Sequence, residues 1–254
     1  MLFSAKTINV FVLICICLNT AFAQRKVVID SLLLLVESDI SHIEKVDIYV
    51  KLAKENSSSD SANTNKYANK AITLAKEIRY REGEINALYE LGLNSMYIGN
   101  HSRAEYTFLK IIEKSDSIGY PKGQANGLNG LGILYWRIGN YEKALESHSK
   151  SLEIRKEIGD KLDISNSLNN IGLVYHVQSN YEITLEYYLK ALTIKKELGD
   201  KKKLVSSYNN IGAIYNNQGN YSKALDFYYL ALNIIDESGD KFRVSSNLMN
   251  IGNI

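Results

Sequence analysis

A glycine recurs every forty residues along most of the chain, and this period constrains the fold more than any other feature. The members of the series are Gly92, Gly132, Gly172, Gly212 and Gly252. Two more series keep the same step, and their members are Asn100, Asn140, Asn180 and Asn220, and Gly119, Gly159, Gly199 and Gly239. Independent positions that share one phase, without insertions, indicate an internal repeat, and a repeat of this length predicts stacked copies of one structural unit.

Each repeat is predicted to contain two helices. In the copy that begins at Lys201, apolar residues recur at spacings of three and four over 201–218 and again over 221–237, which is the pattern of a buried helix face. Gly219 and Asn220 separate the two helices, because glycine adopts the left-handed conformation after a helix and asparagine caps the next one. The chain holds a single proline, and this scarcity of helix breakers favours an all-α fold.

The recurring glycine lies inside the first helix of each repeat, where it needs a packing reason. A glycine within a helix costs about 1 kcal/mol relative to alanine. Gly212 in a first helix and Ala224 in the second helix of the same copy would let the two backbones approach closely, with Tyr215 and Tyr228 filling the volume around the contact. The glycine series therefore predicts tightly packed antiparallel hairpins.

This order of residues resembles the tetratricopeptide repeat. In one copy the resemblance is carried by Leu168, Ile171, Gly172, Tyr175, Thr184, Tyr188 and Ala191. The usual period of that family is about 34 residues. The longer period found here is similar to the long-helix subclass of kinesin light chains and bacterial Rap-type peptide sensors. The resemblance implies an all-α fold, a right-handed superhelical α-solenoid of helix-turn-helix repeats.

The resemblance divides the chain into successive segments. We expect a signal peptide at 1–23, a capping helix at 24–42, a degenerate repeat at 43–82, complete repeats at 83–122, 123–162, 163–202 and 203–242, and the first helix of an incomplete repeat at 243–254. Terminal repeats commonly diverge because one of their faces meets water. An apolar helix that ends the chain without a partner predicts that the sequence is a fragment of a longer protein.

The first residues have the pattern of a secretory signal peptide. Lys6 gives a short basic start, an apolar run of signal-peptide length follows, and Ala21 and Ala23 supply the small residues of a cleavage site. Cys15 and Cys17, the two cysteines of the chain, both lie in this segment, so a mature protein would lack thiols. We therefore expect secretion across the inner membrane to the periplasm, and the alternative is an uncleaved membrane anchor.

Composition and motifs predict no chemistry in this chain. A net charge of +2 provides no overall field that would attract nucleic acid. The histidines at 42, 101, 148 and 176 lack the spacing of a metal site, and no phosphate-binding loop with Gly-Lys-Ser/Thr occurs. We therefore expect no catalytic residue, no metal, no cofactor and no nucleic-acid partner.

The resemblance also implies a binding face, because the first helices of such repeats line the inner side of the solenoid. The inner positions carried over by phase are Asn126, Asn129, Trp136, Arg137, Asn166, Asn169, Asn170, His176, Asn209, Asn210, Asn216 and Asn217. Asparagine combines a donor and an acceptor, so it can bind the main chain of an extended peptide whatever the peptide's sequence. The alternatives are that these amides bond to neighbouring helices, and that Trp136 fills a groove between repeats.

The predicted function is a peptide- or protein-interaction module, the extracytoplasmic sensor or scaffold part of a bacterial signalling protein. One alternative is that the full-length protein is an enzyme, a sensor histidine kinase or a nucleotide cyclase, of which this chain is the non-catalytic input domain. Another is a free periplasmic scaffold. We expect contact with a membrane only through a missing downstream segment or an uncleaved signal anchor.

Overall fold

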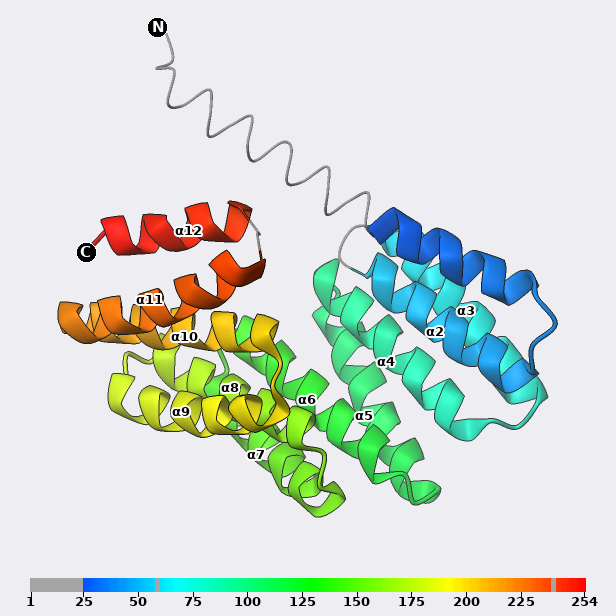
Figure 1. Cartoon of the computed structure of the whole chain (residues 1–254). Coiled ribbons are helices and arrows are strands. Elements are labelled where there is room, and N and C mark those ends of the chain that lie inside the picture. The colour runs from blue at the N-terminus through cyan, green and yellow to red at the C-terminus, as the bar shows by residue number, and fades with distance from the viewer. Residues whose placement is uncertain (1–24, 58–59, 239–240) are drawn as a thin grey trace, which may run out of the picture. The chain divides into compact units, whose positions relative to one another are not determined.

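Every regular element in the described part of the chain is a helix, which confirms the predicted all-α fold (Figure 1). The structure is a computed structural model that describes residues 25–57, 60–238 and 241–254, and it describes the side chains of these residues except those of 236–243. The predicted signal peptide at 1–23 lies outside the described residues.

The described residues form two compact units, each of which is a row of antiparallel helical hairpins. The N-terminal unit, described from residue 25 and ending at residue 158, contains a helix at 25–37 and then α2 (His42–Asn56), α3 (Ser61–Glu77), α4 (Arg81–Tyr97), α5 (His101–Ser117), α6 (Pro121–Arg137) and α7 (Tyr141–Ile158). The C-terminal unit, from residue 159 onward, contains α8 (Lys161–Val177), α9 (Tyr181–Leu198), α10 (Lys201–Asn217), α11 (Tyr221–Ser238) and α12 (Lys241–Gly252). In both units each even-numbered helix up to α10 packs against the helix that follows it, and α12 packs against α11.

The turns of the hairpins α4–α5, α6–α7, α8–α9 and α10–α11 each use one left-handed residue followed by one helix cap. Gly99 has a φ of +80°, and the side-chain oxygen of the next residue, Asn100, accepts a hydrogen bond from the Arg103 N–H at 3.1 Å. Glycine reaches this region of φ without a side-chain clash. Ser179 occupies the equivalent position of its repeat with a φ of +58°, so one hairpin makes the same turn without glycine.

The recurring glycine faces an aromatic ring of the same hairpin. A Cβ atom placed on Gly172 would lie 2.7 Å from two ring carbons of Tyr188, and one placed on Gly212 would lie 2.8 Å from the ring of Tyr228. Real Cβ atoms do not approach other atoms so closely. The same contact joins Gly92 to Phe108 and Gly132 to His148.

The packing reason for the glycine therefore differs in part from the expectation. We expected the glycine to bring two backbones together. At Gly92, Gly132 and Gly172 the nearest atoms all belong to side chains of the partner helix. At Gly212 the carbonyl oxygen of Ala224 also lies 3.2 Å from the Cβ position, so close backbone approach contributes there. The glycine chiefly makes room for a buried ring.

Candidate functional site

Four asparagine side chains on α8 and α10 make no hydrogen bond to any described residue, and we call them the amide face. They are Asn166 and Asn169 on α8, and Asn210 and Asn216 on α10. Asn210 is exposed, and the other three are half-buried. Each amide keeps two donors and an acceptor unused while part of its surface is held out of water. Such groups are suited to a polar ligand that supplies both acceptors and donors.

Two further predicted amides of the C-terminal unit, Asn209 and Asn217, have partners within that unit. The Asn209 side-chain oxygen accepts a hydrogen bond from the Asn247 amide at 2.7 Å, which connects α10 to α12. The Asn217 amide lies 3.4 Å from Nε2 of His176, which connects α10 to α8. Asn170 also makes an interaction of its own. These polar contacts hold successive first helices together.

The two predicted amides of the N-terminal unit are likewise engaged. The Asn126 side-chain oxygen accepts a hydrogen bond from Nη2 of Arg155, on the second helix of the same hairpin, at 3.1 Å. Asn129 is buried, and its amide donates to the Tyr89 hydroxyl at 3.5 Å. Burial raises the pKa of Tyr89. Both amides thus make contacts to side chains of their own unit.

Trp136 and Arg137 differ in their surroundings although they are neighbours on α6. Trp136 is half-buried, and its indole N–H is buried without an acceptor among the described residues. Arg137 is exposed, and its guanidinium carbon lies 5.3 Å from the centre of the Tyr97 ring, at the end of α4. A guanidinium over an aromatic face is attracted by the ring quadrupole.

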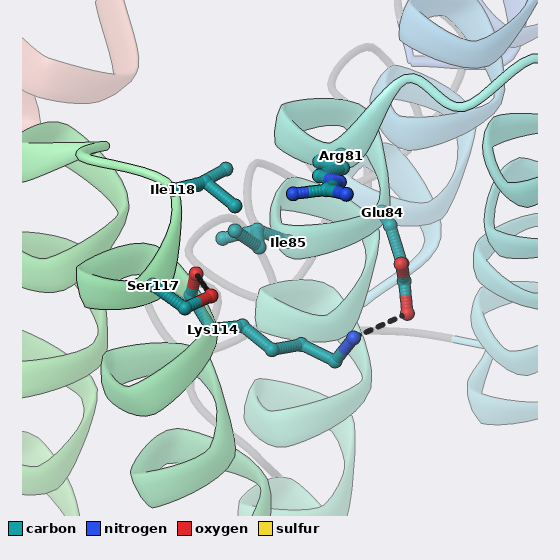
Figure 2. A pocket seen from close by; sticks show the side chains of 6 residues that line it. All are labelled: Arg81, Glu84, Ile85, Lys114, Ser117 and Ile118. Carbon is teal, nitrogen blue, oxygen red and sulfur yellow. Dashed lines mark hydrogen bonds and ion pairs between the residues drawn. The ribbon is translucent and has the colours of Figure 1, made fainter.

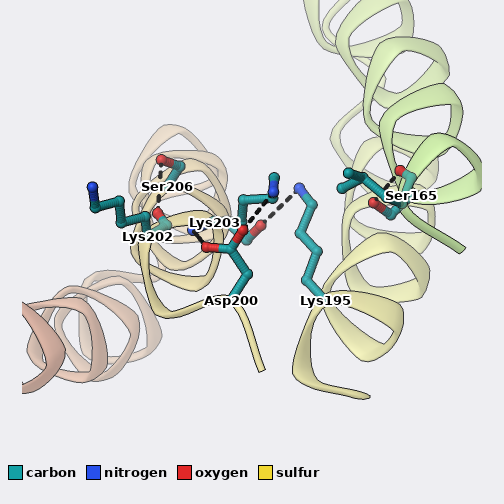
Figure 3. Close-up of polar contacts among 8 residues, drawn as sticks. Ser165, Lys195, Asp200, Lys202, Lys203 and Ser206 are labelled. Atoms are coloured by element: carbon teal, nitrogen blue, oxygen red, sulfur yellow. Dashed lines mark hydrogen bonds and ion pairs between the residues drawn. The ribbon is translucent and has the colours of Figure 1, made fainter. Parts of the chain in front are cut away.

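A buried lysine is a polar feature that sequence reasoning missed. Lys195 on α9 is 5% exposed, and its ammonium group donates to the Ser207 hydroxyl at 3.1 Å. Burial lowers the pKa of Lys195, and the nearby charge of Lys203 acts in the same direction. Figure 3 shows Lys195 reaching toward the start of α10, where Asp200 caps the helix and pairs with Lys203. The buried cation at Arg155 precedes Lys195 by one period, so the position itself could have been found by phase.

A hollow in the N-terminal unit does not coincide with any predicted site residue. It has a volume of about 170 Å³ and is lined by Arg81, Glu84, Ile85, Lys114, Ser117 and Ile118. Figure 2 shows Lys114 extending across it to Glu84, with 3.1 Å between the two charged groups. A broader hollow of about 430 Å³ lies over α2 and α3, between Tyr49 and Glu77.

The described residues contain neither a metal-binding cluster nor a membrane-spanning helix. No group of three or more histidine, cysteine, aspartate or glutamate side chains lies close enough to hold a metal ion within the part of the chain that the structure describes. Among the helices of that part, none has both the length and the apolar character needed to cross a membrane.

Comparison with known families identifies the repeat. The family model described as tetratricopeptide repeat matches residues 123–197 and again 163–237. These matches cover α6 to α11 almost completely. Comparison with curated protein sequences gives no match.

Solved structures of similar fold have the same helical hairpins. BtubC from P. vanneervenii is 19% identical, with a TM-score of 0.66 over 86% of this chain and 91% of that one. Aspartyl phosphate phosphatase F from Bacillus subtilis is 16% identical, with a TM-score of 0.68 over 81% of this chain and 55% of that one. A Rap protein complexed with Competence and Sporulation Factor is 12% identical, with a TM-score of 0.61 over 84% of this chain and 64% of that one. At such identities the likeness establishes the fold, an α-solenoid of tetratricopeptide repeats.

Proposed function

We propose that this chain, which is a tetratricopeptide-repeat protein, binds an extended peptide or an extended segment of a protein through the amide face of α8 and α10. The observation that carries the proposal is the unused hydrogen-bonding capacity of four side chains, Asn166, Asn169, Asn210 and Asn216, on two neighbouring first helices. The Rap protein complexed with Competence and Sporulation Factor supports it as an example of a ligand bound by this fold.

The ligand is expected to be recognised mainly through its main chain. Each asparagine side chain can accept from a peptide N–H and donate to a peptide C=O, which every residue except proline offers. The amide face carries no charge of its own, so binding through it should depend little on ionic strength. A net contribution of about 1 kcal/mol for each hydrogen bond would make four amides a substantial share of a micromolar affinity.

The test uses peptides selected from a random phage-displayed library on the immobilised chain. Asn169→Ala combined with Asn210→Ala should weaken binding of a selected synthetic peptide by roughly tenfold or more, because two hydrogen bonds are lost. The matched control is Asn69→Ala combined with Asn233→Ala, two exposed asparagines on the second helices α3 and α11. N-methylation of the peptide's main-chain nitrogens should also weaken binding. Equal affinities for both double variants would overturn the proposal.

The cellular setting is a second part of the proposal. The signal-like pattern at 1–23 supports an extracytoplasmic location, where the chain would act as the sensor or scaffold part of a bacterial signalling protein. A longer protein that is itself a sensor histidine kinase or a nucleotide cyclase, with this chain as its input domain, is the alternative. An alkaline phosphatase fused after residue 30 should be active in intact bacteria, and an inactive fusion that is nevertheless made would contradict export.

A further inference from the structure

We infer that the tips of two hairpins in the N-terminal unit form a separate docking surface for an acidic, apolar protein segment. The surface consists of Tyr97, Ile98, Arg137 and Ile138, and we call it the hairpin-tip patch. It lies in the other unit from the amide face. It rests on the proposed function only in treating the chain as a peptide-binding protein.

The hairpin-tip patch exposes more apolar surface than the turns require. Tyr97, Ile98 and Ile138 are 51%, 59% and 49% exposed. Ile98 and Ile138 occupy the cap position at the ends of α4 and α6. The same position in the next two repeats holds Gln178 and Gln218, which cap α8 and α10 equally well. The turn geometry therefore does not call for isoleucine, and adjacent exposed apolar side chains indicate an interaction site.

The charge of the patch indicates what kind of partner fits it. The guanidinium of Arg137 lies over the ring of Tyr97, and no carboxylate among the described residues forms an ion pair with it. A guanidinium over a ring keeps its fork of N–H donors, which can bind a carboxylate with two hydrogen bonds. One fixed cation between apolar side chains thus complements a segment that places an aspartate or glutamate beside aliphatic residues. Nucleic acid fits poorly, because its backbone is bound by several cations rather than one.

Both variants that test the patch introduce glutamine, the residue that later repeats carry at the cap position. Arg137→Gln removes the cation and keeps a polar side chain of similar reach. Ile98→Gln combined with Ile138→Gln removes the apolar side chains from the same turns. All three side chains are exposed, so the thermal unfolding midpoint of each variant should stay close to that of the parent chain.

The probe is a phage-displayed library of random dodecapeptides, selected in parallel on the full chain and on each variant. The parent chain should enrich peptides with aspartate or glutamate next to leucine or isoleucine. A synthetic peptide from this class should bind Arg137→Gln at least tenfold more weakly, and its affinity for the parent chain should fall at high salt. Its Asp→Asn or Glu→Gln analogue should bind the parent chain and Arg137→Gln equally well.

Three results would overturn the inference. The first is selection without acidic enrichment. The second is unchanged affinity of the acidic peptide for Arg137→Gln. The third is a concentration-dependent dimer of the parent chain that the double glutamine variant abolishes, because a second copy would then be the occupant.

The amide-face variant separates this inference from the proposed function. If Asn169→Ala with Asn210→Ala loses peptide binding and Arg137→Gln keeps the acidic preference, the hairpin-tip patch fails and the proposed function stands. If Arg137→Gln weakens binding of the acidic peptide and the double asparagine variant binds selected peptides as tightly as the parent chain, the hairpin-tip patch stands and the amide face fails.

Discussion

At the scale of single residues, each recurring glycine from Gly92 to Gly212 is paired with an aromatic ring of the partner helix. One fixed position in the first helix of the repeat holds glycine. The position sixteen residues later, in the second helix, holds phenylalanine, histidine or tyrosine. Gly252 belongs to the same glycine series, yet a Cβ atom there would meet nothing within 4 Å. A ring covers Gly172 in the interior of α8, whereas no ring covers Gly252, the last residue of α12.

Alanine at these two glycines should have opposite effects. Gly172→Ala forces a methyl group against the Tyr188 ring, 2.7 Å from the nearest carbon, and should destabilise the chain by about 1–3 kcal/mol. Gly252→Ala gains helix propensity without a clash and should be neutral or stabilising by up to about 1 kcal/mol. Urea unfolding followed by circular dichroism measures both. Equal losses would show that the ring is not the cause.

Two buried titratable groups of the N-terminal unit should have opposing effects on stability. Burial raises the pKa of Glu90 from 4.5 to about 7, although Lys54 favours the charged form. Burial lowers the pKa of His148 from 6.5 to about 4, and Arg155 acts in the same direction. Glu90 therefore favours folding below pH 4.5 and loses that contribution as the pH rises through about 7. His148 favours folding above pH 6.5 and loses its contribution as the pH falls through about 4. Each pKa shift corresponds to a change of about 3 kcal/mol in the free energy of unfolding across its pH range.

The two slopes cancel between pH 4.5 and 6.5, so single variants should reveal them. Glu90→Gln should give a free energy of unfolding that, relative to the parent chain, rises with pH between 4.5 and 7. His148→Phe puts a phenylalanine ring over Gly132, as Phe108 does over Gly92 in the preceding repeat. Its free energy of unfolding, relative to that of the parent chain, should fall as the pH rises from 4 to 6.5. The measurement is urea unfolding at half-unit intervals of pH. Curves that stay parallel to the parent's would contradict the assigned protonation states.

At the scale of the helix, sequence periodicity predicted most of the fold. The helices expected at 201–218 and 221–237 are α10 and α11, with ends one residue away, because apolar spacing and glycine–asparagine turns act locally. Whether each asparagine side chain is hydrogen-bonded could not be predicted in the same way. Asn126 is bonded to a residue 29 positions away and Asn209 to one 38 positions away. Whether such groups meet depends on packing distances that no local pattern contains, so free and engaged asparagines look alike in the sequence.

The hairpin turns offer a test at the same scale. Ser179 holds a φ of +58° where Gly139 has +79°, and a side chain in this region costs about 1 kcal/mol. Ser179→Gly should therefore raise the free energy of unfolding by up to about 1 kcal/mol, less the entropy that glycine adds to the unfolded chain. Gly139→Ser should lower it by a similar amount. Thermal melts compare the two, and a loss at both positions would contradict the backbone explanation.

At the scale of the whole chain, successive repeats share a scaffold but not a surface. In the N-terminal unit Asn126 and Asn129 are committed to Arg155 and Tyr89. In the C-terminal unit the amide face is free of such bonds. In a repeat protein each unit contacts mainly its neighbours, so side chains on exposed positions can change from one repeat to the next without disturbing the stack. This independence lets one repetitive fold present different binding surfaces along its length.

The central claim, that the free amides rather than the engaged ones bind a peptide main chain, can be measured directly by NMR. Side-chain NH₂ signals of asparagine are recorded while a library-selected peptide is titrated into the ¹⁵N-labelled chain. We predict shifts for Asn166, Asn169, Asn210 and Asn216, and unchanged signals for Asn126 and Asn129. Saturation by the peptide with those four signals unmoved would contradict the account.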